Sequence, residues 1–165
     1  MKLPLALAGA LIVVSSLTAC GGGGDDQATR EAARVKTYCA ALRDAAPEVK
    51  AYNEDDPDYK KLPDYFALMH SLAKKSPTDL KEEWNILDYN ITQIEKAAAA
   101  AKIEFKSIPK LLKGKLPKGA KASKLPGLVT AFAGLKSVTF MTANSRVANG
   151  AAKVCKVDLT PKAKS

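Results

Sequence analysis

The fold is decided by residues 76–105, which read SPTDLKEEWNILDYNITQIEKAAAAAKIEF. Apolar residues recur here at alternating steps of four and three, the spacing of an α-helix with one buried seam. They are Leu80, Trp84, Leu87, Ile91, Ile94, Ala98, Ala101 and Phe105. Ser76, Pro77 and Asp79 stand where a capping hydroxyl, a first-turn proline and the acid of a capping box are expected. Intrinsic propensity does not stabilise such a helix in water, so its seam must pack against other helices.

Two further helices are predicted before this stretch. The first begins near residue 28, and Pro47 should bend or end it. Its apolar face consists of Ala32, Val35, Cys39, Leu42, Ala46 and Val49. The second extends from Asp58 or Pro63 to Lys75. Its inward-facing residues are Leu62, Phe66, Met69 and Leu72 or Ala73.

A last helix is predicted over residues 128–157. Its second half repeats the apolar spacing at Val138, Met141, Ser145, Ala148, Ala152 and Cys155. Gly134 and Gly150 weaken a helix, so a break near Ser137 or Asn144 is expected. Four amphipathic helices pack most simply side by side. The predicted fold is therefore all-α, a four-helix antiparallel up-down bundle with a long basic connection between helices 3 and 4.

Composition supports this fold and restricts the partners. The chain has 165 residues, of which 47% are hydrophobic and only 6% aromatic, and its net charge is +9. This length fits one domain. Packed sheets use aromatic and β-branched residues, so the scarcity of aromatics argues against a β-sandwich. The positive charge attracts anionic polymers and acidic surfaces; no nucleic acid is expected as a partner.

The amino terminus carries a secretion signal. Met1 and Lys2 form a short basic start, and the apolar run over residues 3–17 is shorter than the roughly 20 residues that span a bilayer. The run ends in Leu17-Thr18-Ala19-Cys20, which a glycine-rich segment follows. This arrangement resembles the lipobox of bacterial lipoproteins. The alternative interpretation is an ordinary secretory signal with an unpaired thiol at Cys20.

The resemblance implies that Cys20 becomes the first residue of the mature chain. It would carry a thioether-linked diacylglycerol with palmitate-type acyl chains, which would hold the protein on the extracytoplasmic face of the cell membrane. The expected domains are a signal peptide over 1–19, a lipidated flexible linker over 20–28, the helical bundle over 29–158 and a disordered tail over 159–165. In a Gram-negative cell, Gly21 after the lipidated cysteine would favour transfer to the outer membrane, and both envelope types stay open.

The other two cysteines suggest a disulfide bond between the first and last helices. Cys39 and Cys155 both fall on predicted seams, in the first and last helices. Those helices are neighbours in an up-down bundle, and the compartment outside the cytoplasm is oxidising, so a disulfide between them is expected. Two separate buried thiols are the alternative. A small helical body with one such disulfide resembles the layout of secreted lipoproteins of Gram-positive, especially actinobacterial, bacteria.

The basic connection over residues 106–126 is the candidate binding segment. It holds seven lysines without an intervening acid, together with three prolines and two glycines. Up-down topology places it at the end that faces away from the membrane, beside the acidic turn over 53–58. We expect an anionic wall polymer or an acidic protein to bind Lys110, Lys113, Lys115, Lys118 and Lys121. The alternative is a hydrated, disordered loop that keeps the protein soluble.

Catalytic chemistry has little support. His70 is the only histidine, so the chain lacks a histidine pair for a metal and a spare base for a nucleophile. We therefore expect no catalytic residue, metal or cofactor. The sequence predicts a non-enzymatic, monomeric, membrane-tethered binding or scaffold module. The alternative is a carrier of a small apolar molecule or lipid, which requires an apolar cavity of several hundred Å³ inside the bundle.

Overall fold

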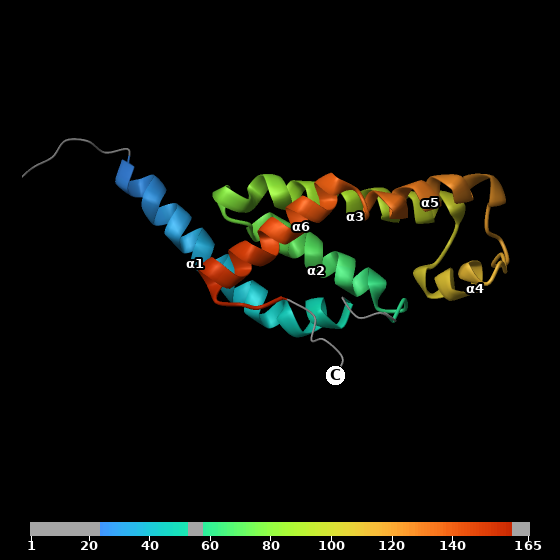
Figure 1. Cartoon of the computed structure of the whole chain (residues 1–165), viewed down its shortest axis with the longest axis horizontal. Coiled ribbons are helices and arrows are strands. Elements are labelled where there is room, and N and C mark those ends of the chain that lie inside the picture. The colour runs from blue at the N-terminus through green and yellow to red at the C-terminus, as the bar shows by residue number, and fades with distance from the viewer. Residues whose placement is uncertain (1–23, 53–57, 160–165) are drawn as a thin grey trace, which may run out of the picture.

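The computed structural model describes residues 24–52 and 58–159, and every regular element in these two ranges is helical. The helices are α1 (Gly24–Tyr52), α2 (Leu62–Lys75), α3 (Lys81–Ala101), α4 (Ile108–Leu112), α5 (Leu125–Gly134) and α6 (Val138–Gly150) (Figure 1). Single helical turns precede α3, α4 and α5, and a π-helical turn over Ala151–Cys155 follows α6. The all-α prediction is confirmed.

The helices follow one another in an extended arrangement. α1 packs on α2, α2 packs on α3, and α3 packs on both α5 and α6. The turn over Ala151–Cys155 brings the end of the chain back to α1. Figure 1 shows the start of α1 and the short helix α4 at opposite ends of the long axis. The main core therefore lies between α1, α2, α3 and α6, while α5 covers the far half of α3.

The predicted fourth helix is two helices. The segments Ala122–Gly134 and Val138–Cys155 are bent by 45° relative to each other. The second begins at Ser137, whose hydroxyl accepts a hydrogen bond of 3.2 Å from the Phe140 N–H. An N-cap of this kind satisfies a backbone donor that would otherwise lack a partner, so it starts a new helix. The break lies at one of the two expected positions.

The seam of α3 is confirmed, but its ends are not. Trp84, Leu87, Ile91, Ile94, Ala98 and Ala101 are all buried. The Ser76 hydroxyl does not cap α3, because it donates instead to the Ala73 carbonyl at the end of α2, at 2.8 Å. Glu31 of α1 holds the single turn that leads into α3: its two carboxylate oxygens accept the Thr78 N–H and the Thr78 hydroxyl, each at 2.7 Å. The bond from the Thr78 N–H lowers the pKa of the Glu31 carboxyl. The helix ends at Ala101, short of Phe105.

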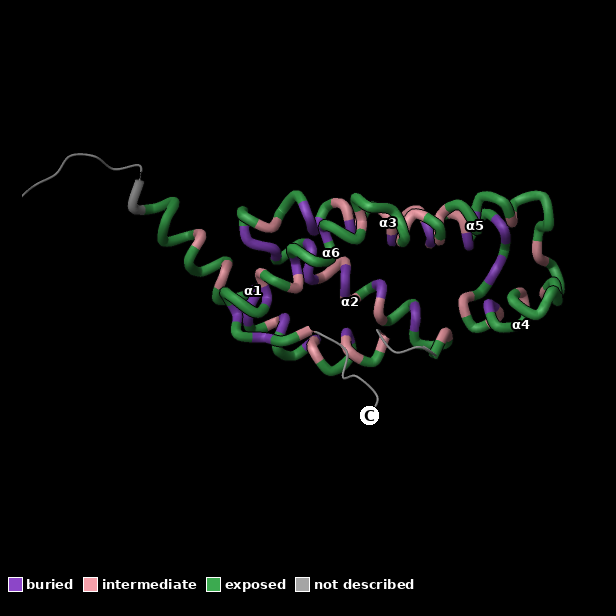
Figure 2. The backbone as a smooth tube through the Cα atoms, in the orientation of Figure 1, coloured by how far each residue is buried: buried purple, intermediate pink, exposed green. Residues whose placement is uncertain are grey.

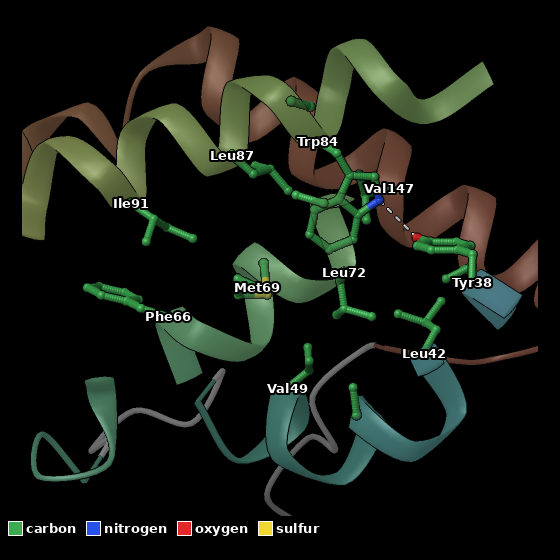
Figure 3. Packing of buried hydrophobic residues seen from close by; sticks show 14 of the residues in the cluster. Tyr38, Leu42, Val49, Phe66, Met69, Leu72, Trp84, Leu87, Ile91 and Val147 are labelled. Atoms are coloured by element: carbon green, nitrogen blue, oxygen red, sulfur yellow. Dashed lines mark hydrogen bonds between the residues drawn. The ribbon is translucent and has the colours of Figure 1, made fainter. Parts of the chain in front are cut away.

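Trp84 is the centre of the core. Its indole N–H donates a hydrogen bond of 3.0 Å to the Tyr38 hydroxyl (Figure 3), and the two rings meet edge to face at 6.1 Å. Both side chains are almost fully buried. Burial raises the pKa of Tyr38 to about 12, although the bond from Trp84 opposes the shift. Two large amphipathic rings thus join α1 to α3 without leaving a buried polar atom unpaired.

Two predictions about the outer helices are wrong. α1 begins at Gly24, so the expected flexible linker over 20–28 is helical from residue 24 onward. On α6, Val138 and Met141 were expected in the seam but are 82% and 60% exposed. The face that α6 and the π-helical turn bury instead consists of Ala143, Val147, Ala151 and Cys155. The contact of α6 with α3 and the contact of the π-helical turn with α1 determine which face is buried.

Glycine permits the close contact between α6 and the start of α3. A Cβ atom on Gly150 would lie 2.7 Å from the Leu80 Cδ1, closer than two carbons pack. A Cβ on Gly134 would lie 2.8 Å from the Asn90 Oδ1. These glycines were expected only to weaken a helix; in the fold they let both α5 and α6 approach α3.

Cys39 and Cys155 form a disulfide, with their Cα atoms 5.0 Å apart. The bond joins the middle of α1 to the π-helical turn after α6, and both residues are buried. The predicted pairing is confirmed. Pro47 lies inside α1, which continues to Tyr52 and changes direction in its last third (Figure 1), as a proline within a helix is expected to cause.

Several sequence predictions lie outside the described residues. These are the signal peptide over 1–19, the lipidated Cys20, most of the acidic turn and the tail beyond Leu159. Leu159 itself packs against the main core, one residue beyond the expected end of the domain. In the described part of the chain no single helix has both the length and the hydrophobicity of a membrane span, whereas Ala122–Gly134 and Val138–Cys155 reach both when taken together.

Candidate functional site

Positive charge is concentrated at one end of the molecule. We call residues 102–124 the cationic tip; they contain eight lysines and a single acid, Glu104. The lysines are all exposed, and they are Lys102, Lys106, Lys110, Lys113, Lys115, Lys118, Lys121 and Lys124. The tip lies opposite the start of α1 (Figure 1), and Figure 2 shows most of its backbone as exposed. The five lysines predicted to bind anions are all in this tip.

The cationic tip is folded and has an apolar cluster of its own. Ala98, Ala101, Ile103 and Leu128 form the buried part of this cluster, and Phe105, Leu111 and Leu125 pack against it. The Lys121 N–H donates a hydrogen bond of 2.8 Å to the Ala101 carbonyl, which ties the segment to the end of α3. These contacts hold the lysines on a defined frame, in contrast to the disordered loop of the alternative interpretation.

The end of α4 brings two lysines together. The Lys115 N–H donates to the Lys110 carbonyl at 2.9 Å, and the Gly114 N–H donates to the Leu111 carbonyl at 2.8 Å. Gly114 has φ +73°, a conformation that glycine adopts without strain. This is a Schellman motif, which places the residue after the glycine beside the first residue of the closing turn. Here both of those residues are lysines.

The end of α3 shows what this motif usually holds. The Ile103 N–H donates to the Ala98 carbonyl at 2.9 Å, and both of these residues are buried in the apolar cluster. An apolar contact at these two positions is the common arrangement. At the end of α4 the same two positions hold Lys110 and Lys115, which are both exposed, so two cationic residues take the place of the apolar contact.

The tip leaves most of its charge unpaired. Lys106 forms an ion pair with Glu104, at 2.6 Å between Nζ and Oε2. Within the described ranges the other seven lysines of the tip have no ion pair with a carboxylate. Leu112 and Leu116 lie among them and are 73% and 48% exposed. The surface therefore combines uncompensated cations with two apolar side chains.

The sequence contained a signal for the pairing of Lys110 with Lys115. Pro109 and Gly114 have the asymmetry of a short helix, with proline in the first turn and glycine just after the end. The tip's apolar cluster was harder to foresee, because it joins Ala98 and Leu128 across thirty residues of sequence.

His70 has a structural role that the sequence did not indicate. Its Nδ1 lies 2.6 Å from Asp88 Oδ1 and its Nε2 lies 3.0 Å from Glu95 Oε2, so the ring joins α2 to two positions of α3 that are about two turns apart. A neutral imidazole has one N–H, so both contacts are hydrogen bonds only when the ring is charged. Burial lowers the pKa of His70, but the bonds to the two carboxylates outweigh it and the pKa is raised.

This contact predicts a pH-dependent stability. A raised pKa in the folded state means that the stabilisation is complete below the unfolded-state pKa of about 6.5 and is lost as the pH rises through the folded-state value. Urea unfolding of the wild type and H70Q should therefore differ more at about pH 5.5 than at about pH 8.5. The change should not exceed about 1 kcal/mol, since Asp88 and Glu95 are 39% exposed. An equal difference at both pH values would contradict the role assigned to His70.

Met69, His70 and Met141 have side chains that can bind a soft metal, but in the fold these side chains do not converge. Met69 is buried in the main core, Met141 is exposed on α6, and the ring nitrogens of His70 face carboxylates. Over residues 24–52 and 58–159 no group of three or more histidine, cysteine or acidic side chains could hold a metal ion.

No protein-family model, curated protein or solved structure matches this chain.

Proposed function

We propose that this protein is a membrane-anchored, extracytoplasmic module without enzymatic activity, whose cationic tip binds an anionic polymer of the cell envelope. The observation that carries the proposal is the folded tip, in which seven lysines form no ion pair with a carboxylate of the described residues and a backbone bond joins Lys115 to Lys110. The lipobox resemblance at Cys20 supports the location. An acidic partner protein is the second class of anion that such a tip can recognise.

The position of the tip supports a partner beyond the anchoring membrane. A lipid on Cys20 would place the start of α1 near the bilayer, and the tip lies at the other end of the long axis (Figure 1). Lysines contribute to binding an anionic leaflet only within about a Debye length of it. While the long axis points away from the membrane, these lysines are available to anions of the wall or to another protein.

The type of cation favours a polymer over a defined acidic epitope. The tip has eight lysines and no arginine, whereas Arg30, Arg34, Arg43 and Arg146 lie elsewhere in the chain. Arginine provides a planar fork for bidentate contacts, while lysine is a point charge on a flexible stem. A set of lysines suits closely spaced charges of variable geometry, as in a polyphosphate or polycarboxylate chain. Binding of this kind is strongly dependent on salt.

Replacing Lys110, Lys113, Lys115 and Lys118 by glutamine should abolish retention on immobilised polyphosphate at low salt. Each lysine near an anionic surface contributes enough that losing four weakens binding by roughly two to three orders of magnitude. The matched control replaces Lys36, Lys74, Lys75 and Lys153, which are exposed outside the tip. Both variants lose four charges, so equal losses of retention would show that only net charge matters and would contradict the proposal.

A crosslinking experiment distinguishes the two classes of partner. A photoreactive residue in place of Lys115 would be activated in intact cells, and the adducts would be analysed by mass spectrometry and by polymer-specific digestion. Adducts of variable mass that a polymer-degrading treatment removes are expected. A single protein adduct would instead favour the acidic partner protein.

A further inference from the structure

A cavity lies in the main core, away from the cationic tip. It is a cavity of about 310 Å³ between α1, α2, α3, α6 and the segment after Cys155. Leu42, Val49, Met69 and Leu72 are among its lining residues, and Figure 3 shows their side chains converging from α1 and α2. Trp84 and Leu159 also line it. The volume is at the lower end of the range for small-molecule sites.

The chemistry of the walls restricts what can occupy the cavity. No charged residue lines it, so an ion would lose its hydration without gaining a partner. Its polar side chains are Tyr65 and Asn144, and neither forms a side-chain hydrogen bond with another described residue. Burial raises the pKa of Tyr65 to about 12, with a smaller contribution from Tyr52, so the hydroxyl remains a donor.

The residues that follow Leu159 in the sequence do not suit this cavity. Leu159 lines the cavity, and the sequence that follows it is Thr-Pro-Lys-Ala-Lys-Ser, whose two lysines do not suit an uncharged apolar space. Ordered water needs two to four polar partners, and most of these walls are hydrocarbon. For scale, an engineered cavity of about 150 Å³ in another protein accepts benzene. The space here is about twice that size.

We propose that this cavity is a binding site for a small neutral molecule of about two fused rings, or an aliphatic chain of similar volume, with one hydroxyl group that bonds to Tyr65 or Asn144. The apolar part lies against the leucine, valine, methionine and tryptophan side chains. The site is separate from the cationic tip and does not depend on the function proposed for it.

The test uses 2-naphthol and naphthalene as probes with the full chain. Titration calorimetry and thermal unfolding should show saturable binding of 2-naphthol, with Kd of the order of 10 to 100 µM. A148F places a ring in the cavity and should weaken binding at least tenfold. A152F adds the same ring one turn later at an exposed position that does not line the cavity, and it should bind as the wild type does. Absence of saturable binding to the wild type, or equal binding by A148F and A152F, would overturn the proposal.

A milder variant keeps the test independent of any folding defect in A148F. Y65F removes only a hydroxyl that has no hydrogen-bond partner among the described residues, so the fold should persist. It should weaken binding of 2-naphthol by about fivefold to tenfold and leave binding of naphthalene unchanged. Equal affinity of Y65F and wild type for 2-naphthol would exclude Tyr65 and leave Asn144, tested by N144A; no effect in either variant would overturn the assigned hydroxyl contact. The variant lacking four lysines of the tip should bind 2-naphthol normally, which separates this site from the proposed function.

Discussion

Replacing both Cys39 and Cys155 by alanine is expected to lower the free energy of unfolding by about 3 to 5 kcal/mol. The disulfide joins residues 116 positions apart. It therefore closes nearly the whole folded chain into one loop, and the entropy of the unfolded chain falls accordingly. The melting temperature should fall by roughly 10 to 20 °C. Urea unfolding of the purified protein measures the change in free energy directly.

The control breaks the disulfide bond of the wild type by reduction instead of by substitution. Reducing the wild type with dithiothreitol should move its urea midpoint close to that of C39A/C155A, while the same reagent should leave the double variant unchanged. Alanine is the better replacement because both positions are buried, and a serine hydroxyl would add a desolvation cost of its own. If the oxidised wild type and the double variant share one midpoint, the bond does not stabilise the fold.

Replacing Trp84 by alanine should cost about 3 to 5 kcal/mol of stability. Trp84 is 1% exposed and is among the largest fully buried side chains of the described chain. Its removal leaves a cavity between α1 and α3 and leaves the Tyr38 hydroxyl without the indole donor. Urea unfolding followed by far-ultraviolet circular dichroism measures the effect, because fluorescence loses its tryptophan signal in this variant.

A double-mutant cycle separates packing from the hydrogen bond. Y38F leaves the indole N–H buried without its acceptor, which should cost about 1 to 3 kcal/mol. W84F removes the donor and some volume. In Y38F/W84F both polar groups are gone, so the double variant should be less destabilised than the sum of the single variants. Strict additivity would mean that the bond between Trp84 and Tyr38 contributes nothing to stability.

The central helix shows how far periodicity predicts structure. Six consecutive seam positions from Trp84 to Ala101 are buried as expected, because a helix turns its side chains at a constant angle and burial follows. The cap did not follow from local sequence. Ser76 carries the preferred residue type for a cap, yet its hydroxyl bonds backward to Ala73. Glu31, 47 residues before Thr78, binds the turn that leads into the helix instead.

The last helix shows why a seam can be misread. Val138 and Met141 fit a regular spacing up to Cys155, and both are exposed. The spacing assumed that regular α-helix continues to Cys155, whereas Ala151–Cys155 form a π-helical turn. Ser137 starts a new helix, and the face that α6 buries is chosen by its contact with Leu80 through Gly150. A π-helical turn holds more residues than an α-helical turn, so it shifts the phase relation between Cys155 and the residues of α6.

The cationic tip has some features that the sequence predicted and others that it did not. Its charge and exposure follow from composition, because lysine side chains are rarely buried and remain in water. Its location between the third and fourth predicted helices follows from the order of the segments along the chain. Its fold does not. The apolar cluster under the tip unites Ala98, Ile103 and Leu128, and the Schellman motif sets Lys115 beside Lys110. Whether lysines act separately or as a pair depends on that backbone geometry.

By itself, the sequence determined the helical class, the seam of α3, the partners in the disulfide and the concentration of charge over residues 102–124. Each of these depends on spacing or residue type along one segment. Only the tertiary structure decided the contact of Glu31 with the turn before α3, the buried face of α6, the His70 contacts and the apolar cavity. Each of these depends on side chains from segments far apart in sequence, and their meeting is set by how whole helices pack.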